Sequence, residues 1–143
     1  MKNQIKPFAL IIEDSISAAK MFSLALEEAG FNTDIILDGI TGINRLAEIT
    51  PDVIVLDLHL PFATGEEILQ QIQNKQRFQS TRIIIATADA NFANFVQDRA
   101  DFVLLKPISY EQLNQLATRL QNVIIPSTTH KNNPTHAPNS DFS

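Results

Sequence analysis

Five short apolar runs recur along the chain, and they constrain its fold more than any other feature of the sequence. Most of them are continuous rather than alternating, and they are rich in Ile, Val and Leu. This pattern is typical of strands whose two faces are both buried, as in a parallel sheet. The runs cover Phe8–Ile12, Asp34–Leu37, Val53–Leu56, Arg82–Ala86 and Phe102–Leu105.

Segments with helical spacing of apolar residues separate and follow these runs. Polar residues that suit helix N-caps precede three of the segments, at Asp38, Thr64 and Ser109. Strand and helix therefore alternate five times, and right-handed crossovers place the helices on both faces of the sheet. The sequence predicts a doubly wound α/β fold with a five-stranded parallel sheet and three layers. The first helical stripe consists of Ile16, Ala19, Phe22, Leu26 and Ala29.

The chain length suits a single domain. With 143 residues, of which 44% are hydrophobic and 19% charged, the composition is that of a globular protein. We expect the domain to span residues 1–125. Residues 126–143 are rich in Pro, Ser, Thr and Asn and lack an apolar period, which predicts a disordered tail or a truncated linker. His130 and His136 lie in this tail, where we expect them to be solvated.

Charge and residue usage exclude several classes of protein. The net charge of -5 argues against direct binding of nucleic acid, which needs a basic surface. The absence of cysteine excludes disulfides and thiolate metal sites. The apolar runs are too short to span a membrane, and the N-terminus lacks the apolar core of a secretory signal. A cytoplasmic location follows by elimination.

Polar residues close the apolar runs, at the strand ends where open parallel sheets bind ligands. These residues are Glu13 and Asp14, Asp38, Asp57, Thr87 and Lys106. If the first, third, fourth and fifth strands are neighbours, all of them except Asp38 can meet in one crevice. The second strand then takes an edge of the sheet.

The three carboxylates in this crevice repel one another, so they either have raised pKa values or require a cation. Oxygen ligands favour a hard ion, and a site linked to phosphate favours Mg²⁺. Lys106 adds a compact positive charge, and Thr87 adds a hydroxyl donor. Together these groups suit a phosphoryl group in transit, and one of the carboxylates serves as the nucleophile.

The same residues resemble those of a known family, the receiver domains of bacterial response regulators. The resemblance covers roughly residues 7 to 125 and rests on four motifs in order, each at a strand end. The motifs are Glu13-Asp14, Asp57-Leu58-His59-Leu60-Pro61 followed by Gly65, Thr87-Ala88, and Lys106-Pro107.

The resemblance implies a flavodoxin-like fold with strand order 2-1-3-4-5 and a cis peptide bond at Lys106-Pro107. It implies that Asp57 accepts a phosphoryl group from a sensor histidine kinase or a phosphotransfer protein. Signalling would then occur through altered binding to an unknown downstream protein, with no chemistry beyond self-phosphorylation and autodephosphorylation. The implied cofactor is Mg²⁺ or Mn²⁺. The implied site residues are Glu13, Asp14, Asp57 and the backbone carbonyl of His59 as metal ligands, Thr87, Ala88 and Lys106 around the phosphoryl group, and His59 and Asp89 as residues that tune its lifetime.

Two features depart from the family pattern. The position three residues before the lysine usually carries Tyr or Phe, but here it is Val103, and the neighbouring Phe102 faces the other side of its strand. The stretch from Thr87 to Lys106 is also about one turn short, so we expect a stunted fourth helix from about Asn91 to Gln97. Family members often dimerise and bind partners there, so any homodimer is expected to be weak.

Other polar residues have simpler interpretations. We expect the His59 side chain to face solvent. We interpret Asp34, Asp38 and Asp52 as caps or surface charges.

Three other functions remain as alternatives. A pseudo-receiver would keep the fold as a constitutive protein-interaction module, which Val103 and the short fourth helix favour. A phosphohydrolase with an aspartyl nucleophile generally needs a second acid two residues later, where this chain has His59. A flavin- or dinucleotide-binding domain would need a Gly-rich loop after the first strand, and none of the four glycines lies there.

Overall fold

The computed structural model describes residues 5–124. The strands are β1 (Phe8–Ile12), β2 (Asn32–Ile36), β3 (Val53–Asp57), β4 (Arg82–Thr87) and β5 (Phe102–Leu105). The helices are α1 (Ile16–Glu28), α2 (Gly39–Leu46), α3 (Gly65–Gln73), α4 (Ala90–Val96) and α5 (Tyr110–Val123), with short 3₁₀ helices η1 (Gln76–Phe78) and η2 (Gln97–Arg99). The tail expected at 126–143, with His130 and His136, lies outside the described residues, and so does the expected domain end at residue 125.

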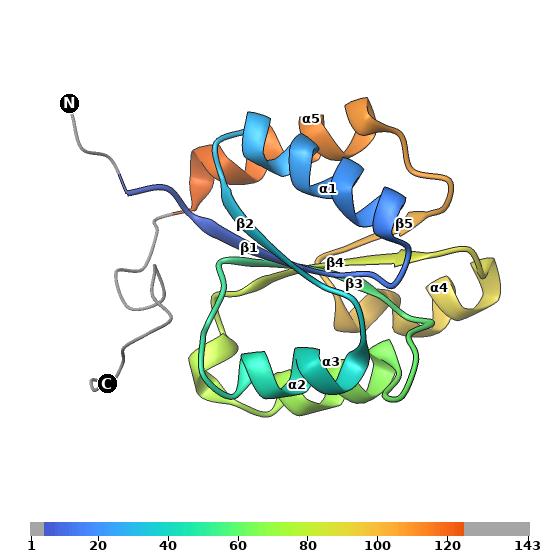
Figure 1. Ribbon diagram of the computed structural model, residues 1–143. Helices are drawn as coiled ribbons and strands as arrows, with labels where there is room; N and C mark the ends of the chain where they lie inside the picture. The colour runs from blue at the N-terminus through green and yellow to red at the C-terminus, as the bar shows by residue number, and fades with distance from the viewer. Residues whose placement is uncertain (1–4, 125–143) are drawn as a thin grey trace.

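All five strands run parallel in one sheet, in the order β2-β1-β3-β4-β5. The predicted strand order is therefore confirmed. Helices α1 and α5 cover one face of the sheet, and α2, α3 and α4 cover the other (Figure 1). Within the part of the chain that the structure describes, no helix is long and apolar enough to cross a membrane.

The continuous apolar runs fill two cores, one on each face of the sheet. Ala9 and Ile11 of β1 point into the core beneath α1 and α5, whereas Leu10 and Ile12 point into the core beneath α2 and α3. All four side chains are fully buried. Truncating a buried Leu or Ile in such a core to Ala typically costs about 2–5 kcal/mol. The two cores thus hold the strands, and the residues at their ends, in fixed positions.

Several local predictions differ from the structure. The second strand begins at Asn32 rather than Asp34, because it is an edge strand whose first residues are exposed or half-buried and carry no apolar pattern. Ile16 is 57% exposed, since it begins α1 beyond the edge of the core. Asp52 is neither a helix cap nor a surface charge. It is buried, and its carboxylate accepts a hydrogen bond from the Phe8 backbone N–H at 2.8 Å.

The predicted caps are present. Asp38 accepts from the Thr41 N–H at the start of α2. Thr64 and Glu67 form a reciprocal capping box at the start of α3. The fourth helix has only seven residues, as the short stretch between Thr87 and Lys106 predicts.

Phe62, in the loop between β3 and α3, has a positive φ of 74° and a side chain that is 84% exposed. A left-handed backbone is unfavourable for a residue with a bulky side chain, because the Cβ approaches the following carbonyl oxygen. The exposed ring recovers little of this free energy through packing. The loop that follows Asp57 therefore carries local strain.

We expect Phe62→Asn to raise the free energy of unfolding by about 1 kcal/mol, because Asn tolerates the left-handed conformation. Urea denaturation measures the change. Phe62→Ala is the matched control, since it removes the ring but keeps a Cβ that disfavours positive φ, and we expect little gain. If both variants gained equally in the free energy of unfolding, the gain would come from removal of the exposed ring, and the claim of backbone strain at Phe62 would be wrong.

Candidate functional site

The carboxyl ends of β1, β3, β4 and β5 lie side by side because of the strand order. Asp57 and Thr87 are the last residues of β3 and β4, while Glu13 and Lys106 follow directly after β1 and β5. The predicted convergence of these strand ends is confirmed. Asp38 stays apart, since it follows the edge strand and caps α2.

Glu13, Asp14 and Asp57 form an acidic cluster at this edge. Each offers one carboxylate oxygen, and these oxygens lie within 4.8 Å of one another. Glu13 and Asp57 are only 1% and 3% exposed, whereas Asp14 is exposed. Like charges at this distance, two of them withdrawn from water, disfavour ionisation unless positive charge is nearby.

Lys106 supplies positive charge to this cluster. Its Nζ lies 2.9 Å from Glu13 Oε1 and 3.6 Å from Asp57 Oδ2. Burial alone would lower the pKa of Lys106, but the contact with Glu13 and the charge of Asp57 outweigh burial and raise this pKa. With all groups ionised, three carboxylates face one ammonium, which leaves a net charge of -2.

The carboxyl group of Asp57 is not fully compensated by its surroundings. The pKa of Asp57 is raised from 3.8 to about 6, mainly by burial and also by the negative charge of Glu13. The His59 backbone N–H, which donates to Asp57 Oδ1 at 3.0 Å, and the Lys106 ammonium act in the opposite direction. Any further positive charge at the site would therefore stabilise the ionised form of Asp57.

The donor set of the cluster fits a divalent metal ion. Glu13 Oε1 is buried and, among residues 5–124, accepts no hydrogen bond of good geometry, so Lys106 reaches it only as an ion pair. Glu13 Oε2 accepts from the Ser15 N–H at 3.2 Å. Oxygen ligands with excess negative charge suit a hard cation such as Mg²⁺. The acidic cluster could therefore hold such an ion.

Close packing fixes the loop that follows Asp57. A Cβ on Gly65 would lie 2.3 Å from the Asp57 backbone oxygen and 2.6 Å from Leu58 Cα, so only glycine lets α3 start this close to the end of β3. A Cβ on Gly39 would likewise lie 1.9 Å from the Ala63 carbonyl oxygen. The starts of α2 and α3 therefore hold the loop from both sides.

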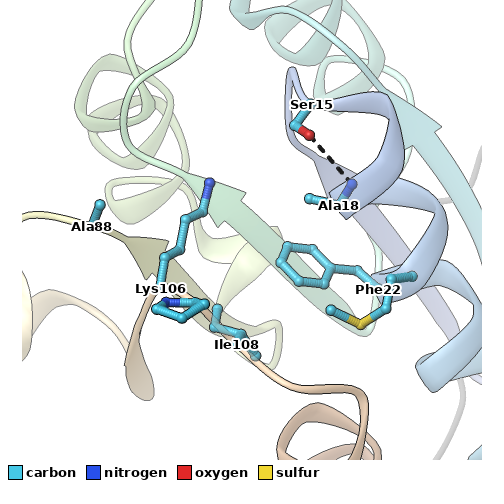
Figure 2. Close-up of a pocket in the computed structure, with 8 residues that line it drawn as sticks. Ser15, Ala18, Phe22, Ala88, Lys106 and Ile108 are labelled. Carbon is cyan, nitrogen blue, oxygen red and sulfur yellow. Dashed lines mark hydrogen bonds between the residues drawn. The ribbon is translucent and has the colours of Figure 1, made fainter.

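A groove of about 450 Å³ opens beside Lys106. Figure 2 shows Ser15, Ala18 and Phe22 of the α1 side facing Lys106 and Ile108 across it. The sequence did not single out Ser15, which caps α1 by accepting from the Ala18 N–H (Figure 2) in addition to binding Glu13. The lining is mostly apolar and comprises Ser15, Ala18, Met21, Phe22, Ala88, Lys106, Pro107 and Ile108. The peptide bond between Lys106 and Pro107 is cis, as the resemblance implies.

On the other side of the site, Thr87 is joined to the start of α4. The buried Thr87 hydroxyl accepts from the Asp89 N–H at 3.1 Å, and the Asp89 carboxylate accepts from the N–H groups of Asn91 and Phe92. Asp89 is therefore the N-cap of α4. This role was recognisable in principle, because an Asp directly before a helical segment is a common cap.

The His59 side chain is exposed, as expected, but it is not isolated. Its ring lies 6.1 Å from the ring of Phe92, centroid to centroid. No sequence pattern indicates this contact, because it joins a loop to a helix 33 residues away along the chain. It brings the loop after β3 and the first turn of α4 together.

Residues 9–118 match the family model described as the response regulator receiver domain. The chain belongs to this family. Receiver domains are signalling domains of two-component systems rather than conventional enzymes, and phosphorylation and magnesium binding are typical of them.

Two curated relatives are longer regulators. Response regulator ArlR of Staphylococcus saprophyticus is 37% identical over 107 residues, which are 73% of this chain and 47% of that protein. The DNA-binding dual master transcriptional regulator RpaA of Synechocystis is 31% identical over 110 residues, which are 75% of this chain and 46% of that protein. The chain thus spans about half the length of these relatives.

Solved receiver structures match over most of the described fold. The chemotaxis response regulator CheY4 of Vibrio cholerae aligns with a TM-score of 0.73 and 25% identity, over 81% of this chain and 99% of that one. The BeF3-activated DrrB receiver domain aligns with a TM-score of 0.72 and 25% identity, over 82% of this chain and 99% of that one.

Val103 occupies the position at which the resemblance leads us to expect an aromatic ring. Val103 is half-buried and packs against the core beneath α2 and α3, whereas Phe102 packs against the core beneath α1 and α5. The two side chains thus lie on opposite faces of β5, so Phe102 cannot stand in for an aromatic ring at position 103.

We expect Asp57→Asn to stabilise the receiver in metal-free buffer at pH 7 by up to about 3 kcal/mol, because it removes a buried charge whose pKa is raised from 3.8 to about 6. Between these two pH values the unfolded chain releases the Asp57 proton while the folded protein keeps it. Wild-type stability therefore falls as pH rises through this window, and the difference from Asp57→Asn vanishes below about pH 4. Urea denaturation in EDTA at several pH values measures the effect.

The exposed Asp98→Asn is the matched control, with an expected change within about 0.5 kcal/mol. If Asp57→Asn were no more stable than the wild type at pH 7, the claim that the Asp57 charge is poorly compensated would be wrong.

Proposed function

We propose that Asp57 accepts a phosphoryl group from a phosphohistidine on a sensor histidine kinase or a phosphotransfer protein. In this proposal the phosphorylated receiver then changes its binding to a downstream protein. The observation that carries the proposal is the position of the Asp57 carboxylate. It is buried at a strand end, close to two further carboxylates and 3.6 Å from the Lys106 ammonium.

The proposed transfer needs little chemistry from the protein beyond charge and orientation. An Asp57 oxygen forms a bond to phosphorus while the bond between phosphorus and the imidazole nitrogen breaks, and the imidazole leaves with that electron pair. Negative charge is spread over the phosphoryl oxygens. We assign Lys106 to stabilise this charge, Thr87 to donate its hydroxyl hydrogen to a phosphoryl oxygen, and Ala88 to leave room beside it.

We assign Glu13, Asp14, Asp57 and the backbone carbonyl of His59 as ligands of Mg²⁺ or Mn²⁺. The oxygen-only donor set, the net charge of -2 and the poorly satisfied Glu13 Oε1 support this assignment. When bound, the ion supplies positive charge for the phosphoryl oxygens. The chain's own contribution is to hold the carboxylates together before transfer and to exclude water from Glu13 and Asp57.

His59 and Asp89 are assigned to the lifetime of the phosphoryl group. Both side chains are exposed and lie in the loops that follow the site strands, where they limit the approach of water to the phosphorus. Asp89 also caps α4, so its replacement changes more than water access.

The downstream partner is proposed to be a protein. The acidic net charge of -5 does not favour direct contact with nucleic acid, although one relative is described as DNA-binding. A cytoplasmic location and at most a weak homodimer complete the proposal.

A pseudo-receiver is the second candidate, and Val103 is the observation that favours it. Such a domain would keep the fold as a constitutive interaction module without a working site. The two candidates differ in metal binding, because the pseudo-receiver has no need of a saturable Mg²⁺ site.

We expect beryllofluoride, which mimics a phosphoryl group on a carboxylate, to bind the wild-type receiver in the presence of Mg²⁺. Binding at 100 times the dissociation constant stabilises a folded protein by about 2.7 kcal/mol, so thermal unfolding and calorimetry both report it. Asp57→Asn should abolish this binding, whereas the surface control Asp98→Asn should retain it.

Equal binding by wild type and Asp57→Asn would contradict the assignment of Asp57. A wild-type protein without saturable Mg²⁺ binding would favour the pseudo-receiver instead.

A further inference from the structure

Two separate routes join the phosphoacceptor site to the first turn of α4. Along the first, the Thr87 hydroxyl accepts from the Asp89 N–H at 3.1 Å, and the Asp89 carboxylate accepts from the Phe92 N–H at 3.2 Å. Along the second, Asp57 Oδ1 accepts from the His59 N–H at 3.0 Å, and the His59 ring contacts the Phe92 ring. The routes start at different residues of the site and meet at Phe92.

Helix α4 is built so that its N-terminal turn depends on these contacts. It has seven residues, and helices this short are marginal without capping or packing. Asp89 satisfies the N–H groups of Asn91 and Phe92, which have no partner within the helix. A shift of Asp89 therefore acts directly on the backbone that carries Phe92.

The C-terminal side of α4 is anchored elsewhere. Arg99 in η2 contacts Glu66 at 3.2 Å and donates to Gln73 Oε1 at 3.0 Å, and the Gln73 side chain donates back to the Arg99 carbonyl at 3.1 Å. These contacts tie the end of the α4–η2 segment to α3. Movement at the cap is thus taken up in the first turns of α4 rather than by a shift of the whole segment.

Phe92 also connects the first turn of α4 to an exposed side chain. Its ring stacks on that of Phe95 at 5.9 Å and 19°. Phe95 is 64% exposed, whereas Ala93 and Val96 are buried on the other side of the helix. Phe92 itself is half-buried against the core beneath α2 and α3, so it links that core to the exposed Phe95 ring.

We propose that Phe92 is the positioning residue through which the phosphorylation state of Asp57 reaches α4. This inference rests on the proposed function, since a phosphoryl group on Asp57 that receives the Thr87 hydroxyl hydrogen would reorient this hydroxyl, and the added group would crowd the His59 loop. The contacts along both routes then change together, and the exposed Phe95 ring changes its position on the surface.

The test is amide hydrogen exchange of residues 90–96, measured by mass spectrometry on the full chain with Mg²⁺, before and after addition of beryllofluoride. In the wild type we expect exchange in this segment to change about fivefold or more, the lower end of typical coupling between sites. In Phe92→Leu, which keeps an apolar side chain but loses the ring contacts, beryllofluoride should still bind while the change in α4 disappears. Val103→Ala is the matched control and should keep the wild-type response.

Asp89→Ala and Asp89→Asn give an independent reading if Phe92→Leu fails to fold. The Ala variant removes the cap and should lose most of the α4 response, whereas Asn is a good cap and should retain it.

Three results would overturn the inference while leaving the proposed function intact. In the first, Phe92→Leu responds as the wild type does. In the second, the response is lost in Val103→Ala but kept in Phe92→Leu. In the third, wild type binds beryllofluoride and α4 does not respond, which rejects the coupling alone. Failure of the wild type to bind beryllofluoride would reject the proposed function and the coupling with it.

Discussion

The repulsion among Glu13, Asp14 and Asp57, only partly relieved by Lys106, is the interaction on which the rest of the site depends. Two buried carboxylates at neighbouring strand ends are unfavourable by themselves, and the two apolar cores hold them there. Burial, with the neighbouring charge of Glu13, raises the pKa of Asp57. The Lys106 ammonium lies against Glu13, and three carboxylates around one ammonium leave an excess of negative charge. The site therefore lowers the stability of the fold, and a bound positive charge would offset this cost. Functional sites often carry such a local cost in stability.

Much of this arrangement could be predicted from the sequence, because it follows from the ends of buried strands. Continuous apolar runs indicate a parallel sheet, and the polar residue after each run marks the ligand edge. Glu13, Asp57 and Lys106 therefore converge as predicted. The start of the edge strand could not be predicted, because Asn32 and Thr33 lie at a partly exposed edge of the sheet and carry no apolar pattern. Contacts such as Asp52 with the Phe8 amide, or His59 with Phe92, join segments far apart in the chain and leave no local pattern.

The departures from the family pattern cluster in one region, around α4 and β5. β5 carries Val103 where the resemblance leads us to expect an aromatic ring, and α4 is limited to seven residues. The described contacts around this helix instead involve Phe92, Phe95 and His59. The chain spans about half the length of the curated relatives it matches.

Phosphorylation by a small donor tests the central claim about Asp57 most directly, because it needs no partner protein. Phosphoramidate contains the same type of phosphorus–nitrogen bond as phosphohistidine. After incubation with phosphoramidate and Mg²⁺, the intact mass of the wild-type chain should increase by one phosphoryl group, and peptide mapping should place it on Asp57. Asp57→Asn should show no increase. Equal modification of Asp57→Asn, or a phosphoryl group found on another residue, would contradict the claim.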